Sequence, residues 1–133
     1  MRVLVRRLTC ERGQALVEGL LALGLVVLVV AFAVQAIAYA HARSVAIASA
    51  QDGARAAAAG GPDAGVARAS EILGAAGGTG AGLHPSVSEQ ADEVTVHVDG
   101  QAPRLFGLPL LLPAVRASAS LPIERYPTAE AAP

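Results

Sequence analysis

The chain has 133 residues, of which 53% are hydrophobic, and its mean hydropathy of +0.49 is high for a soluble domain. The net charge is −1 overall, and the acidic balance of residues 14–133 argues against a nucleic-acid-binding protein, because that function calls for clustered basic residues. The single cysteine, Cys10, excludes an intrachain disulfide. This length leaves room for one small domain beside a membrane segment.

The N-terminal residues 1–13 are predicted to form a basic leader. They contain four arginines and one acid, a net charge of +3, whereas residues 14–133 have a net charge of −4. Positive charge on a short flank orients a membrane helix with its N-terminus in the cytoplasm. We therefore expect a single-pass protein of the cell membrane, whose C-terminal region is extracytoplasmic.

An uncharged apolar run of 22 residues, Gly19–Ala40, follows the leader. A helix needs about 20 predominantly apolar residues to cross a bilayer, so this run is long enough to be a transmembrane segment. No proline interrupts residues 14–59, and alanine and leucine, which favour helices, are abundant there. One helix is therefore predicted over 14–59, and it should leave the bilayer near His41 as a stalk.

A lone carboxylate, Glu18, stands at the edge of the apolar run. Ionisable groups at the edge of a membrane segment are costly, which makes Glu18 a candidate functional residue. Gln14 lies one helical turn before it, on the same face. A cut after Gly13 would give Gln14 a free α-amine that could neutralise Glu18, within one chain or between neighbouring subunits.

Breaker residues divide the remaining chain, 60–133, into a small exported region with a Pro/Ala-rich tail. Gly60-Gly61-Pro62 should end the long helix. Asp63 is placed to be the N-cap of a second helix over 64–73. The glycine-rich residues 74–82 are expected to form a flexible loop.

Two later segments, 93–99 and 114–121, alternate apolar and polar residues and are predicted to be strands. They should pair as antiparallel strands across the connection 100–113, which is apolar enough to pack on something. The fold class expected is α+β, with a long transmembrane and stalk helix, a short helix and a small antiparallel β region. The side chains expected to face inward are Val94, Val96, Val98, Val115, Ala117, Ala119 and Leu121.

No catalytic or metal site is predicted from the residue pattern. His41, His84 and His97 lack metal-ligand spacing, and no Ser/His/Asp arrangement can be argued from spacing. We therefore expect neither an enzyme nor a cofactor or small-molecule substrate. Alanines at every fourth residue could instead let another helix of a filament approach closely. They are Ala38, Ala42, Ala46, Ala50, Ala54 and Ala58.

The sequence Arg12-Gly13-Gln14-Ala15-Leu16-Val17-Glu18 resembles the start of TadE-like minor pilins (pseudopilins) of tight-adherence type IV pilus systems. The resemblance covers residues 11–59. It implies that a prepilin peptidase cuts after Gly13, that Gln14 becomes the new N-terminus, and that Glu18 is the fifth mature residue. It also implies partners among other pilin or pseudopilin subunits and a role in pilus assembly or initiation.

Two other interpretations of the N-terminus remain open. Ala36-Ile37-Ala38 and Ala38-Tyr39-Ala40 resemble signal-peptidase sites, so a cut there would release a secreted soluble chain from about His41. The second is a plain membrane anchor whose leader is never removed. The size of the apolar run and the position of Glu18 near its start favour the pilin interpretation.

Overall fold

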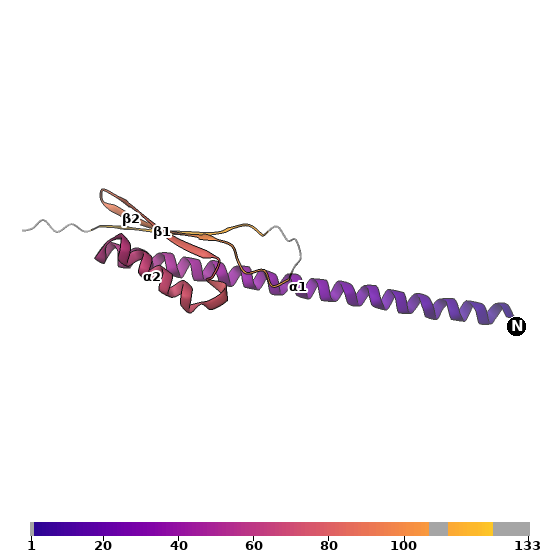
Figure 1. Cartoon of the computed structure of the whole chain (residues 1–133). Coiled ribbons are helices and arrows are strands. Elements are labelled where there is room, and N and C mark those ends of the chain that lie inside the picture. Colours follow the sequence, from indigo (N-terminus) through magenta and orange to yellow (C-terminus); the bar gives the residue numbers. More distant parts are fainter. Residues whose placement is uncertain (1, 107–111, 124–133) are drawn as a thin grey trace, which may run out of the picture. The chain divides into compact units, whose positions relative to one another are not determined.

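The computed structural model describes residues 2–106 and 112–123, with side chains from residue 13 onward. Three helices and three strands are present in this part of the chain (Figure 1). They are α1 (Arg2–Gly60), α2 (Pro62–Ala75), the short 3-10 helix η1 (Gly77–Thr79), β1 (Leu83–Gln90), β2 (Glu93–Gly100) and β3 (Val115–Pro122). The predicted α+β class is confirmed.

The chain divides into two compact units, Met1–Ala36 and Ile37–Pro133. In the first, the described residues belong to α1 alone. The second, called the folded unit below, contains the remainder of α1 together with α2, η1 and the sheet. Helix α1 already begins at Arg2, so the predicted leader is helical as well, and α1 ends at Gly60, beside the predicted breaker.

The turn between α1 and α2 depends on Gly61, whose φ of +88° is a conformation that other residues rarely adopt. Pro62 follows as the first residue of α2, where its fixed φ suits a helix and its missing N–H is not needed. Gly61 is therefore the N-cap. The prediction that Asp63 caps this helix is wrong, because Asp63 lies inside the first turn and no side chain caps it.

The sheet has the order β1-β2-β3 and is antiparallel throughout, with Val87 opposite Val96 and Val96 opposite Ala119. The predicted pairing of 93–99 with 114–121 is confirmed. Strand β1 was not expected, because Pro85 and three serine or histidine neighbours make its sequence look like a loop. Proline is tolerated there because β1 is an edge strand.

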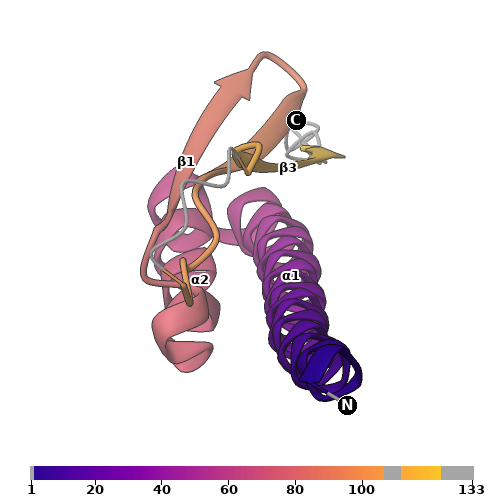
Figure 2. The same ribbon diagram turned by 90° about the vertical axis from the view of Figure 1, so that its right-hand side faces the viewer.

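One face of the sheet covers the helices of the folded unit, where α1 and α2 lie side by side (Figure 2). The inward side chains of β2 are fully buried, as predicted, and those of β3 are buried at Val115 and half-buried farther on. Buried residues of the core are Ala42, Ala46, Ala50, Ala54, Ala57, Ala69, Leu73, Leu83, Val94, Val96, Val98, Ala102 and Val115. No fully buried side chain in the described part is larger than valine.

The alanines at every fourth residue of α1 belong to this core. Ala42, Ala46 and Ala54 are completely buried and Ala50 is 1% exposed, all within the same chain. The expectation that this row serves a neighbouring subunit is therefore wrong for these four residues. Their small side chains let the sheet and α2 approach α1 closely, which is the same physical effect applied inside one chain.

Helices α1 and α2 approach each other closely at two glycines, Gly53 and Gly65. A Cβ atom on Gly65 would lie 2.6 Å from the Cβ of Ala57 and 3.0 Å from the carbonyl oxygen of Gly53. Ser49 adds a buried hydrogen bond across the helix pair, because its Oγ donates to the carbonyl oxygen of Ala69 at 3.1 Å. The side chains between the two helices are small, so the helix backbones themselves come into contact.

Three connecting segments differ from expectation. The glycine-rich residues 74–82 are not a plain loop, because they contain the end of α2, the helix η1 and a turn in which Leu83 N–H donates to Gly80 O. In the apolar connection, Leu105 and Phe106 are exposed rather than packed, and residues 107–111 lie outside the described part. Ile123 N–H donates to Asp92 O at 2.9 Å, and the remainder of the predicted tail is not described.

Replacement of Gly65 by alanine is expected to destabilise the folded unit. The added methyl group would collide with Ala57, and overpacking of this kind costs about 1–3 kcal/mol. The matched control is Gly74→Ala in the same helix, where nothing lies within 4 Å and alanine should stabilise by about 0.5–1 kcal/mol. Hydrogen exchange of the β2 amides in detergent micelles measures both free energies. Equal effects from the two variants would contradict the close approach.

Replacement of Ser49 by alanine should lower the free energy of unfolding by about 1 kcal/mol, because it removes a buried hydrogen bond between α1 and α2. Ser44→Ala provides the comparison, since Ser44 Oγ bonds only the Ala40 carbonyl of its own helix and is exposed. That control should change stability by less than about 0.5 kcal/mol. The same exchange measurement applies, and an unchanged free energy for Ser49→Ala would contradict the assigned bond.

Candidate functional site

The three residues of the predicted processing and pairing site lie on consecutive turns of α1. Gly13, Gln14 and Glu18 are all helical and all exposed. Gln14 and Glu18 are four residues apart, so they occupy the same face of the helix, as the sequence predicted. Among the side chains that the structure describes, Glu18 takes part in no hydrogen bond or ion pair.

Nothing in the described part of the chain gives Gly13 a packing role. A Cβ atom at this position would have no heavy atom within 4 Å. Glycine inside a helix is less stable than alanine by about 0.5–1 kcal/mol, so its presence here has a local cost. The absence of a side chain also allows another backbone or an enzyme subsite to approach closely, which is what a cleavage site needs.

The apolar part of α1 exposes its large side chains on all sides. Leu16, Leu20 and Leu21 are 71%, 70% and 71% exposed, and the valines that follow are similar. This helix, near the N-terminus, is long and apolar enough to cross a membrane. Gly19 and Ala40, the predicted ends of the span, are both exposed, and Ala40 belongs to the folded unit.

Cleavage after Gly13 would change the electrostatics around Glu18. In the intact chain α1 begins at Arg2, so the positive end of the helix dipole lies far from this carboxylate. A helix that begins at Gln14 would bring that end, together with the new α-amine, to within about one turn of Glu18. Such an interaction is typically worth about 0.3–1 kcal/mol at an exposed helix end and more where water is excluded.

The outer face of the sheet is polar and carries several hydroxyl groups. Thr95 Oγ1 and Ser120 Oγ are hydrogen-bonded at 2.8 Å, and Ser88 Oγ lies 3.4 Å from His97 Nε2. Asp99 faces Arg116, whose Nε is 3.9 Å from Asp99 Oδ1. The Ser88–His97 and Arg116–Asp99 contacts are both long and open to solvent. They do not have the short hydrogen bond between a nucleophile and a base that would activate Ser88.

The ion pairs on the helices of the folded unit are solvent-exposed. Arg68 bonds Glu71 at 2.8 Å and lies 3.8 Å from Asp52, which connects α2 to α1. The hydrogen bond and the charge of Glu71 raise the pKa of the Arg68 guanidinium. Exposed pairs of this kind contribute little to stability, so they are structural details of the surface and not a site.

Two hollows of the folded unit lack the chemistry of a ligand site. One is at the β1–β2 turn and is lined by Gln90, Ala91, Asp92, Glu93 and Pro122. The other separates α1 from the free edge of β3 and is lined by Gln51, Ala54, Arg55, Ser118, Ala119, Ser120 and Leu121. Neither contains histidine. In the part of the chain that the structure describes, no three His, Cys, Asp or Glu residues are grouped to hold a metal ion.

Comparison with known proteins leaves these residues as the sole basis for a function. The chain matches no protein-family model, no curated protein and no solved structure. The resemblance to TadE-like minor pilins therefore depends on the sequence of residues 11–59 alone. Helix α1 carries all three residues of the predicted site, Gly13, Gln14 and Glu18.

Proposed function

We propose that the chain is a minor pilin-like (pseudopilin) subunit that acts in assembly or initiation of a tight-adherence type IV pilus. A prepilin peptidase cuts it after Gly13 on the cytoplasmic side of the cell membrane. The apolar helix anchors the product in the bilayer, and the folded unit lies outside. Its partners are the lipid bilayer, the peptidase and other pilin or pseudopilin subunits.

The observation that carries the proposal is the position of Gly13 at the start of the exposed, membrane-length part of α1. The glycine has no packing role among the described residues, and its helical setting makes it locally unfavourable. Recognition by a peptidase supplies a reason for it. Glu18 is exposed at the same end of the apolar run. Cleavage would create an α-amine that can pair with its carboxylate, which explains a charged residue at this position.

A secreted soluble protein is the second candidate, and one observation favours it. The folded unit begins at Ile37, close to the two small-residue sites that end at Ala38 and Ala40. A cut after Ala40 would, however, remove Tyr39, which packs against the core. The pilin proposal keeps that residue in the mature chain.

The mature N-terminus decides among the three interpretations. Mass spectrometry of protein from its native cell is expected to find a chain that begins at Gln14 with a free amine. A start near His41 would support secretion, and an intact leader beginning at Met1 would support a plain anchor. Cyclisation of the new terminal glutamine would remove the amine and contradict its pairing with Glu18.

The variant Gly13→Leu should abolish processing, because the side chain would block access to the peptide bond that is cut. The matched control is Gly24→Leu, since Gly24 is also helical and also has nothing within 4 Å of its Cβ position. Both variants change helix propensity in the same way, so only recognition distinguishes them. Immunoblots should show the longer, unprocessed form for Gly13→Leu alone.

Removal of the charge at position 18 should impair assembly but not cleavage. In Glu18→Gln the side chain keeps its size and loses its affinity for a neighbour's α-amine, whereas Glu18→Asp keeps the charge. We expect Glu18→Gln to be trimmed normally but to lose co-purification with other pilus subunits, with at least partial recovery in Glu18→Asp. Glu89→Gln, an exposed change in the folded unit, is the control. Normal assembly of Glu18→Gln would contradict the role assigned to this carboxylate.

A further inference from the structure

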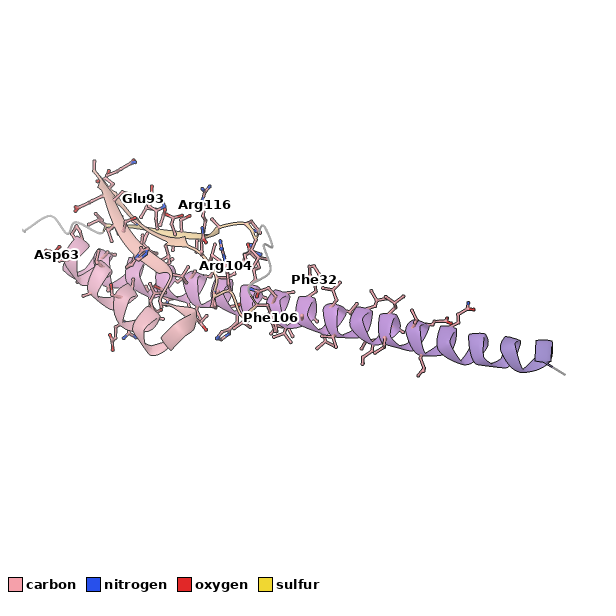
Figure 3. The ribbon with its side chains drawn as sticks, turned by 45° about the vertical axis from the view of Figure 1, so that its right-hand side comes forward. Phe32, Asp63, Glu93, Arg104, Phe106 and Arg116 are labelled. Carbon is pink, nitrogen blue, oxygen red and sulfur yellow. The ribbon has the colours of Figure 1, made fainter. Side chains whose placement is uncertain are left out.

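The folded unit carries an exposed apolar pair outside its helices. Leu105 is 52% exposed and Phe106 is 40% exposed. They are the large hydrophobic side chains that the described part of the chain exposes outside α1. Both follow β2 in the connection to β3, and Figure 3 labels Phe106 and its neighbour Arg104. Adjacent exposed apolar side chains of this size form a small apolar surface that can contact lipid or protein.

The pair lies at the end of the folded unit where the apolar helix enters it. Val96 of β2 packs at Gly53, since its Cγ1 is 3.3 Å from a Cβ built there. From that point β2 and the residues after it run along α1 toward lower residue numbers (Figure 1). Ala102 and Ala42 accordingly belong to the same buried cluster. Figure 3 shows Phe106 at the end of the folded unit opposite to Asp63, and therefore on the side of Ile37.

The length of the apolar run places the edge of a bilayer at this level. The hydrocarbon core is about 30 Å thick, and helix residues from Glu18 to Ile37 rise about 28 Å. Ile37 is 68% exposed, and the next formally charged residue is Arg43. A span that begins at Glu18 thus ends at Ile37, which is the first residue of the folded unit.

The chemistry of the segment suits a lipid–water boundary. Aromatic and large apolar side chains are stable at the edge of the acyl chains, and arginines nearby can reach lipid phosphates. Arg104 is exposed next to the pair and donates to Gln101 Oε1 at 3.2 Å, and Arg43 is exposed on α1. Apolar groups and cations are thus combined at one end of the unit.

We infer that Leu105 and Phe106 insert into the interfacial region of the outer leaflet of the cell membrane. Arg104 and Arg43 bind the phosphate groups of the lipids in that leaflet. The inference depends on the membrane span in the proposed function but not on processing or pilus assembly. On this inference the folded unit contacts the membrane at two places, through α1 and through Leu105 and Phe106. The loop then restricts rotation and tilt of the unit about α1.

The absence of tryptophan from the chain allows a direct test. Three single-tryptophan variants of the full-length protein, Phe106→Trp, Phe32→Trp and Ile47→Trp, are placed at one chain per nanodisc. The discs contain phosphatidylcholine and phosphatidylglycerol, with or without bromine near the start of the acyl chains. Phe32 lies in the apolar helix and is the positive control. Ile47 matches Phe106 at 40% exposed but lies about 15 Å beyond Ile37 along α1, so it is the negative control.

The expected result is loss of most emission from Phe32→Trp and Phe106→Trp in brominated lipid, with blue-shifted spectra, and no loss from Ile47→Trp. Quenching of Phe32→Trp alone would overturn the inference and leave the span intact. Quenching of none would overturn both. Equal quenching at positions 47 and 106 would also overturn it, because the whole unit would then lie on lipid.

A second copy of the chain could cover Leu105 and Phe106 in place of lipid, and the same variants test this alternative. If Phe106→Trp becomes blue-shifted only when several chains share a disc, and bromine does not quench it, another protomer covers the pair and the inference is wrong. Unchanged circular dichroism of all three variants establishes that they are folded. Each substitution is at an exposed position, so the core remains as it is in the parent chain.

Discussion

The folded unit is held together by close approach of backbones and not by large side chains. Its core consists mainly of alanine and valine, and the two helices meet at Gly65, which leaves no space for a methyl group, and at Gly53, which leaves very little. Contacts of this kind tolerate almost no added volume, because packed interiors respond to even one methylene group. The same constraint explains why α1 is rich in alanine after residue 40, where the helix changes from an exposed apolar surface to a surface covered by its own sheet.

Periodicity predicted the elements whose residues point alternately into and out of the core. Val94, Val96 and Val98 identified β2, and the alternation in 114–121 identified its partner. Strand β1 was missed because its inward positions include Pro85, which only an edge strand permits. Asp63 was assigned as a cap because its side chain suits that role, but the left-handed conformation of Gly61 moves the cap two residues earlier.

The alanine row shows a different limit of sequence-based inference. Spacing predicted a surface for close packing, and Ala42, Ala46, Ala50 and Ala54 do form one. Spacing alone cannot say which partner covers it, because a small-residue face accepts a sheet of the same chain as readily as a neighbouring helix. The candidate site has the same character. Residues 13, 14 and 18 follow from a pattern and lie on successive exposed turns of α1, where no packing within the described part of the chain tests the roles that the pattern predicts.

If the chain is inserted in a membrane as proposed, the boundary between the two units affects the order of events during insertion. The folded unit starts at Ile37 and includes the half-buried Tyr39 and the buried Ala42, so its core draws on the last residues of the apolar run. In a membrane-inserted chain, α1 can support the sheet only after this stretch has emerged from the translocation machinery. The folded unit would then be complete only when α1 has reached its final depth in the membrane. Folding of this unit is thereby coupled to insertion of its own helix.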